Sequence, residues 1–338
     1  MVGTPCPASC IFLTAAPAIL RPARTVCHLS RNRFTTVHVV SSNQTASFLI
    51  KRFKEAGVRP DTRHGQNFLI DLNLQRLLAS TAELGPDDVV LEVGTGTGAL
   101  TARLAAKAAE VVTVEVDHEL YQLASEELAD LGNVTMLCQD ALRNKNNLHP
   151  RILETVREKL DQAPGQRFKL AANLPYNIAT PVIANLLSVE PPPVSMTVTI
   201  QKELADRIVS SPGTKDYGAL SIWMQSQCDV RLVRVMTPEV FWPRPKVTSA
   251  IIQITLAPGR RDRIADRPFF HSFVRAMFFH RRKFLRNVVL SAFKNRLGKA
   301  EVDQILSGQG LDATTRAEQL DVQTMLALCE AVRAVVPD

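Results

Sequence analysis

An Asn-Leu-Pro-Tyr sequence carries side chains whose types and spacing could do chemistry. Asn173, Leu174, Pro175 and Tyr176 follow an expected strand at residues 168–172, and ligands bind past the ends of such strands in open α/β folds. The Asn side-chain carbonyl and the Leu174 backbone carbonyl can accept both N–H bonds of a planar amine, such as that of adenine, and direct its lone pair toward a methyl sulfonium. Pro175 restricts the backbone, and Tyr176 offers a face on which a base can stack. The pattern predicts a site for methylation of an amino nitrogen; the alternative is a proline-containing turn beside a core tyrosine.

A glycine-rich turn precedes this site in the chain. The apolar run 89–91 leads into Gly94, Gly96 and Gly98, as a buried strand runs through a tight turn into a helix. The next apolar run ends at Glu115, and an acid about 20 residues beyond a glycine turn is the usual partner of a ribose hydroxyl. The spacing G-x-G-x-G favours an adenosyl cofactor without a pyrophosphate. A glycine turn that binds no ligand is the alternative.

Two further side chains are candidates for the same site. Asp140 follows an apolar run and could accept a hydrogen bond from the amino group of a cofactor adenine, although such an acid can also be a loop residue or a helix cap. Phe241 lies on a proline-braced loop and could form a second stacking wall, although an isolated Phe there is more often a core residue.

The elements that position these residues alternate between strand and helix patterns. This alternation predicts an α/β fold with a doubly wound, mostly parallel sheet, whose segments 228–235 and 250–256 form an antiparallel edge. After Pro258 every periodic segment is helical, which predicts a small all-α domain. We therefore expect an N-terminal extension at residues 1–44, a ligand-binding domain at 45–258 and a helical domain at 259–338.

The net charge of +7 is unevenly distributed. Residues 1–54 hold seven Lys and Arg and no acid, so the remaining 33 of the 40 basic residues balance the 33 acidic ones. Residues 271–300, in contrast, hold eight Lys and Arg and no Asp or Glu. This clustering predicts phosphate contacts to RNA; a solvated charged helix face is the alternative. The predicted RNA-binding residues are Arg281, Arg282, Lys283 and Arg286.

Composition excludes several classes of function. The six cysteines form no CxxC pair and the seven histidines show no ligand spacing, so we expect no metal site. Apolar runs are far shorter than the ~20 residues of a membrane-spanning helix, so we expect no membrane association. Residues 1–40 contain Arg and Ser but no acid, which fits an organellar transit peptide, a disordered tail or an over-extended start equally well.

Taken together, these segments resemble the KsgA-type ribosomal RNA adenine dimethyltransferases over about residues 60–330. The matching stretches are HGQNFLID (64–71), EVGTGTGALT (92–101), VEVD (114–117), NLPYNIATP (173–181), QKELADRI (201–208), YGALS (217–221), FWPRPKVTSA (241–250), RRKFLRN (281–287) and RAEQL (316–320). The resemblance implies a Rossmann-like, class I methyltransferase that uses S-adenosylmethionine. It further implies that two methyl groups are placed on N6 of each of two adjacent adenosines near the 3′ end of small-subunit rRNA, within an assembling small subunit.

The resemblance also implies roles for individual residues. Asn173 and the Leu174 backbone would orient the target amine, and Tyr176 and Phe241 would enclose the flipped adenine. The implied cofactor-binding residues are Asn67, Leu69, Gly94, Gly96, Gly98, Glu115, Asp140 and Asn173.

Two features depart from the family pattern. Thr95 stands where the family usually has Pro, which bears on the rigidity of the glycine turn. The polar stretch 141–167 is longer than the family pattern leads us to expect, and it has no assigned role.

Two other classes compete with this interpretation. DNA-adenine and protein-glutamine methyltransferases share the Asn-x-Pro-Tyr logic, but they carry a second Pro before the Tyr, where this chain has Leu174. A ribosome assembly factor, or a mitochondrial transcription factor of the same fold, would act mainly by binding. We expect a monomer in the bacterial cytoplasm, with an organelle as the alternative if residues 1–40 are a transit peptide.

Overall fold

The computed structural model describes residues 45–60 and 65–336, all within one compact unit. The predicted extension at residues 1–44 lies outside the described residues. In the described part of the chain, no helix combines the length and the apolar character needed to cross a membrane.

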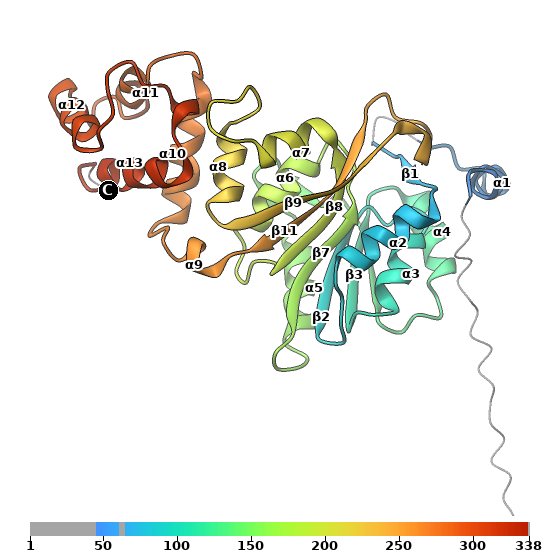
Figure 1. Cartoon of the computed structure of the whole chain (residues 1–338). Coiled ribbons are helices and arrows are strands. Elements are labelled where there is room, and N and C mark those ends of the chain that lie inside the picture. Colours follow the sequence, from blue (N-terminus) through green and yellow to red (C-terminus); the bar gives the residue numbers. More distant parts are fainter. Residues whose placement is uncertain (1–44, 61–64, 337–338) are drawn as a thin grey trace, which may run out of the picture. The chain divides into compact units, whose positions relative to one another are not determined.

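A seven-stranded sheet forms the centre of this unit (Figure 1). In spatial order the strands are β4 (Val134–Cys138), β3 (Glu110–Glu115), β2 (Asp88–Val93), β7 (Arg167–Asn173), β8 (Ser195–Gln201), β11 (Ser249–Leu256) and β9 (Cys228–Met236). The first five strands in this order are parallel, and β11 runs antiparallel to both of its neighbours, β8 and β9, as predicted for the edge. The mostly parallel α/β fold predicted from the sequence is confirmed.

Strand β2 shows why the sheet is covered on both faces. All six of its residues are buried. Val89 and Leu91 belong to the same core cluster as Ile152 of helix α5, whereas Val90 belongs to another cluster with Leu104 of helix α3. Because successive strand residues point to opposite faces, an uninterrupted apolar run needs a helix layer on each side. The helices of this part are α1 (Ala46–Ala56), α2 (Leu72–Thr81), α3 (Ala99–Ala105), α4 (His118–Glu127), α5 (Pro150–Leu160), α6 (Ala179–Leu186), α7 (Lys202–Val209) and α8 (Ala219–Gln225).

Two short strand pairs were not predicted. Strand β1 (Phe68–Leu69) pairs antiparallel with β10 (Phe241–Trp242), which follows the 3-10 turn η2 (Pro238–Val240). The polar stretch 141–167 contains a small hairpin of β5 (Leu142–Asn144) and β6 (Asn147–Leu148) ahead of helix α5. Strands of two or three residues leave no periodic signal, so only tertiary pairing defines them.

The chain becomes helical after the last strand, as predicted. The elements are α9 (Pro258–Arg261), α10 (Arg267–Phe279), α11 (Leu285–Ala292), α12 (Lys299–Gly308), the 3-10 turn η3 (Ala317–Gln319) and α13 (Val322–Arg333). The main apolar core nevertheless continues from Ile200 through Trp223 of α8 to Phe270 of α10. A domain division at residue 258 therefore stays a prediction.

Candidate functional site

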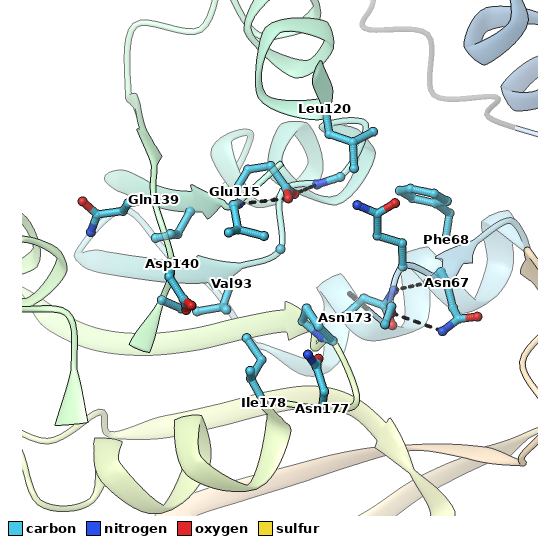
Figure 2. Close-up of a pocket in the computed structure, with 18 residues that line it drawn as sticks. Asn67, Phe68, Val93, Glu115, Leu120, Gln139, Asp140, Asn173, Asn177 and Ile178 are labelled. Atoms are coloured by element: carbon cyan, nitrogen blue, oxygen red, sulfur yellow. Dashed lines mark hydrogen bonds between the residues drawn. The ribbon is translucent and has the colours of Figure 1, made fainter. Parts of the chain in front are cut away.

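A pocket of about 160 Å³ lies where β2, β3, β4 and β7 reach their carboxyl ends, and we call it the glycine-turn pocket (Figure 2). Seven of the predicted site residues line it: Asn67, Gly94, Gly96, Glu115, Asp140, Asn173 and Pro175. Five others do not: Leu69, Gly98, Leu174, Tyr176 and Phe241. Segments up to about a hundred residues apart therefore meet here, as expected for parallel strands whose carboxyl ends share one edge.

Glu115 lies at the end of β3 with its carboxylate held by backbone N–H groups. Gly96 N donates to Oε2 at 2.8 Å, and the N–H groups of Val116 and Asp117 donate to Oε1 at 3.0 and 3.1 Å. Burial raises the pKa of Glu115, and these three hydrogen bonds oppose that rise. The side chain is fixed in one orientation, and its remaining lone pairs can accept bonds from hydroxyl groups.

Asp140 and its neighbour Gln139 line the pocket beside Glu115, where strand β4 ends, and Asn67 and Phe68 lie on the far side (Figure 2). Asp140 is exposed, and one of its carboxylate oxygens accepts the Leu142 N–H at 2.8 Å. The Nε2 atom of Gln139 is buried without a hydrogen-bond partner in the part of the chain that the structure describes. The Asp140 carboxylate has further lone pairs that suit a ligand donor, such as the amino group of an adenine. Gln139 was missed in the sequence, where nothing distinguishes it from any loop glutamine.

The glycines of the turn serve packing as much as ligand access. Gly94, Gly96 and Gly98 all have positive φ, at 89°, 57° and 80°. A Cβ on Gly94 would come within 3.2 Å of Pro175, and one on Gly98 within 3.1 Å of Leu128. Gly94 thus lets the turn approach the Asn-Leu-Pro-Tyr loop. Gly98 instead lets the start of α3 pack against Leu128, and it does not line the glycine-turn pocket.

A buried hydrogen-bond chain lies behind the glycine turn. Thr101 and Thr113 donate to Glu92 Oε2 at 2.5 and 2.7 Å, and the Thr95 hydroxyl lies 2.6 Å from that of Thr113. Because Thr113 donates to Glu92, Thr95 is the donor to Thr113. Burial raises the pKa of Glu92 to about 8 and outweighs the threonine bonds, so this carboxyl is neutral at pH 7. Thr95 therefore anchors the turn by a hydrogen bond where the family pattern uses the stiffness of proline.

Asn173 is oriented through its amide nitrogen (Figure 2). Nδ2 donates to the backbone carbonyl of Asn67 at 2.9 Å, and Asn67 Nδ2 donates to Gly65 O at 3.2 Å. In residues 45–60 and 65–336 no donor reaches the Asn173 side-chain carbonyl. The adjoining backbone is fixed as well, since Leu174 N donates to Thr199 O at 3.1 Å. The amide is therefore held with its donor side used and its acceptor side free.

Tyr176 and Phe241 differ in how accessible their rings are. Tyr176 is partly buried, its hydroxyl lies 2.5 Å from Ser249 Oγ, and burial raises its pKa. Phe241 is only 2% exposed, because strand β10 places its ring in a cluster with Leu69 and Met236. The structure thus does not present Phe241 as an open stacking wall, and a base could reach its ring only after the ring was uncovered.

The predicted RNA-binding arginines fall into two groups. Arg281 donates to Glu318 and to the backbone carbonyls of Thr214 and Lys215, and Arg286 forms a two-bond ion pair with Asp303. Arg282 and Lys283 are exposed, and their side chains make no hydrogen bond or ion pair within the described residues. Half of the predicted set therefore already has protein partners.

In the described ranges, no group of three His, Cys, Asp or Glu side chains lies close enough together to hold a metal ion.

Comparison with known proteins agrees with this geometry. Residues 58–332 match the family model described as "Ribosomal RNA adenine dimethylase". The chain is 36% identical over 283 residues to the "Ribosomal RNA small subunit methyltransferase A" of Moorella thermoacetica, which covers 83% of this chain and 95% of that protein. It is 39% identical over 271 residues to the protein of the same name from Bacillus cereus, which covers 79% and 89%.

Solved structures show the same fold. A dimethyladenosine transferase from Plasmodium falciparum superposes with a TM-score of 0.64 at 22% identity, covering 76% of this chain and 94% of that one. The 23S rRNA methyltransferase ErmE gives a TM-score of 0.53 at 24% identity, covering 79% and 99%. At such identities these likenesses support the fold alone.

Proposed function

The chain belongs to the ribosomal RNA adenine dimethylase family, and from that premise we propose that it dimethylates N6 of two adjacent adenosines near the 3′ end of small-subunit rRNA. It is a methyltransferase of the S-adenosylmethionine-dependent type. The proposed substrate is the RNA within an assembling small subunit, since RNA bound through phosphates is recognised by shape as much as by sequence.

The glycine-turn pocket is where S-adenosylmethionine would bind. Glu115 would accept the ribose hydroxyls, and Asp140 with Gln139 would meet the adenine edge. A Cβ on Gly94 would meet Pro175 and one on Gly96 would meet Phe68, so these glycines let two walls of the pocket approach the turn. When bound, the cofactor supplies a methyl group on a sulfonium. The exposed carboxylate of Asp140, held in place by the Leu142 N–H, is the observation that most favours a ligand at this wall.

The orientation of Asn173 carries the proposal. Its amide nitrogen is tied to Asn67, which leaves the side-chain carbonyl free to accept one N–H of the target amine. The Leu174 backbone carbonyl would accept the second N–H, since its peptide is anchored to Thr199. With both N–H groups held, the nitrogen lone pair leaves conjugation with the ring. No strong base is required, because the proton can depart once the nitrogen is cationic.

Tyr176 would support the flipped base from one side. Its ring direction is set by the hydroxyl contact with Ser249, itself fully buried. Phe241 as the second wall requires that the β1–β10 pair open when RNA binds, because the ring is covered now.

The deciding experiment measures transfer of tritiated methyl groups from S-adenosylmethionine to immature small subunits that lack this modification. We expect label in N6,N6-dimethyladenosine of the RNA. Asn173→Ala should reduce transfer about 10²- to 10³-fold, as removal of one preorganised polar group does, while rRNA affinity is retained. Asn185→Ala, on the outer side of α6, is the matched control and should transfer normally. Loss of rRNA binding in Asn173→Ala would make Asn173 structural.

Parallel reactions separate the competing functions. Naked DNA and a release-factor protein serve as alternative acceptors, and label in either would reject rRNA as the substrate. Absence of label in all of them, with rRNA binding intact, would favour an assembly or transcription factor. The intact Glu115, Asp140 and Asn173 favour catalysis. A monomeric state and a bacterial cytoplasmic location are part of the proposal; gel filtration and tagging of the full chain test them.

A further inference from the structure

A groove of about 540 Å³ lies between helices α10 and α11, apart from the glycine-turn pocket and sharing no residue with it. Half of its eight lining residues are small: Ser272, Ala276, Ser291 and Ala292 have side chains of one heavy atom or two. Small side chains leave a space between two packed helices that larger residues would fill. The volume falls within the range of ligand sites of small-molecule size.

Phe279 stands at this groove with its ring in solvent. It is 80% exposed, whereas no other large apolar side chain in the described ranges exceeds the 49% of Val116. The helix explains why it points outward: Phe270, Phe273 and Met277 of α10 face the core, and Phe279 lies on the opposite side at the last helical residue. The Phe279 ring lies edge-on to the His280 ring, with 4.8 Å between the ring centroids and 75° between the ring planes. The fold itself therefore does not use this ring.

The surroundings of the groove are positive. Arg275, one helical turn before Phe279, is exposed and lines the groove, and within residues 45–60 and 65–336 its guanidinium makes no hydrogen bond or ion pair. Burial and the nearby Arg275 lower the pKa of His271. Residues 271–300 contain no carboxylate, so the groove has no negative counterpart on its own two helices.

We propose that this groove binds an unpaired nucleotide of the RNA substrate, with its base stacked on Phe279 and its phosphate held by Arg275. This inference rests on the proposed function, which supplies the RNA. An exposed aromatic ring beside unpaired cations is the combination with which proteins hold single-stranded nucleic acid. A protein partner would call for a broad apolar face, yet here one apolar ring stands among small and charged residues. The neighbouring Arg282 and Lys283 extend the same positive surface.

Binding of a fluorescein-labelled, protein-free small-subunit rRNA fragment to the full-length chain tests the inference. Phe279→Ala should weaken binding about 5- to 100-fold, the range for loss of one stacked base, and leave its salt dependence unchanged. Phe279→Trp should retain affinity. Arg275→Ala should weaken binding and reduce the slope of log K against log salt by about one phosphate contact. Ile50→Ala, an exposed apolar residue of α1, is the control.

Methyl transfer to small subunits separates this inference from the proposed function. Phe279→Ala should raise the KM for subunits and leave kcat near the wild-type value, because the ring lies outside the glycine-turn pocket. Wild-type affinity for the fragment in Phe279→Ala, with methylation intact, would overturn the inference alone. Weakened binding to whole subunits but not to the protein-free fragment would also overturn it, in favour of a protein contact. Absence of methylation by the wild type, with the Phe279→Ala defect in fragment binding present, would overturn the proposed function instead.

Discussion

Replacing Glu92 by Gln should change how the stability of this protein depends on pH. Glu92 is 1% exposed, and both hydroxyl groups that bond to it reach the same oxygen, Oε2. Its other oxygen, Oε1, has no partner within the described residues. A glutamine can keep its carbonyl where Oε2 lies and thus retain both threonine bonds. The substitution therefore removes the ionisation and preserves the shape.

The magnitude follows from the raised pKa. The unfolded carboxyl titrates near 4.5 and the folded one near 8, so the folded state holds a proton that the unfolded state has lost across this window. The stabilisation is fully present below pH 4.5 and disappears as pH rises to about 8. At about 1.4 kcal/mol per pH unit, the wild type should lose up to about 5 kcal/mol relative to Glu92→Gln between these limits.

Urea unfolding, followed by tryptophan fluorescence at pH values from 5 to 9, measures this difference. The free energy of unfolding of Glu92→Gln minus that of the wild type should grow with pH up to about 8 and then stay level. Glu126→Gln, on the exposed face of α4, should track the wild type throughout. A difference between Glu92→Gln and wild type that does not change with pH would refute the assignment of a neutral, buried carboxyl.

Three further changes test other contacts. Arg281→Ala should lower the melting temperature measured by scanning fluorimetry, because it removes the ion pair to Glu318 and two carbonyl contacts worth about 1–3 kcal/mol together. Arg282→Ala should instead weaken RNA binding at an unchanged melting temperature. Equal melting temperatures of the two variants would place both arginines in the same role. Thr113→Val should lower the free energy of unfolding in urea at pH 6 by about 1–3 kcal/mol, because it removes the hydroxyl that bonds to both Thr95 and Glu92. Thr113→Ser should restore most of that loss. An unchanged free energy of unfolding in Thr113→Val would mean that the hydrogen-bond chain behind the glycine turn contributes nothing to stability. Tyr176→Phe should keep single-turnover methyl transfer within about tenfold of wild type and Tyr176→Ala should not, since stacking needs the ring and not the hydroxyl; equal losses would contradict stacking.

Local pattern alone was enough to predict much of this protein. The apolar run at residues 89–91, the glycines after it and Glu115 at the next strand end predicted the parallel sheet and the edge at which the glycine-turn pocket lies, because period and turn chemistry are local properties. The Asn-Leu-Pro-Tyr sequence likewise allows a prediction of chemistry, since that chemistry would reside in consecutive residues; its role stays a prediction. The family followed from such motifs, and the comparisons confirm it.

Only the tertiary structure decided what each side chain touches. The sequence left Phe241 open as a stacking wall or a core residue, and pairing with a strand more than 170 residues earlier buries its ring. Arg281 and Arg286 looked like their neighbours in a basic run, yet acids 37 and 17 residues away take them as partners. The raised pKa of Glu92 and the role of Thr95 depend on burial and on Thr113 of another strand. Burial and long-range pairing depend on the packed chain as a whole, and no local pattern encodes them.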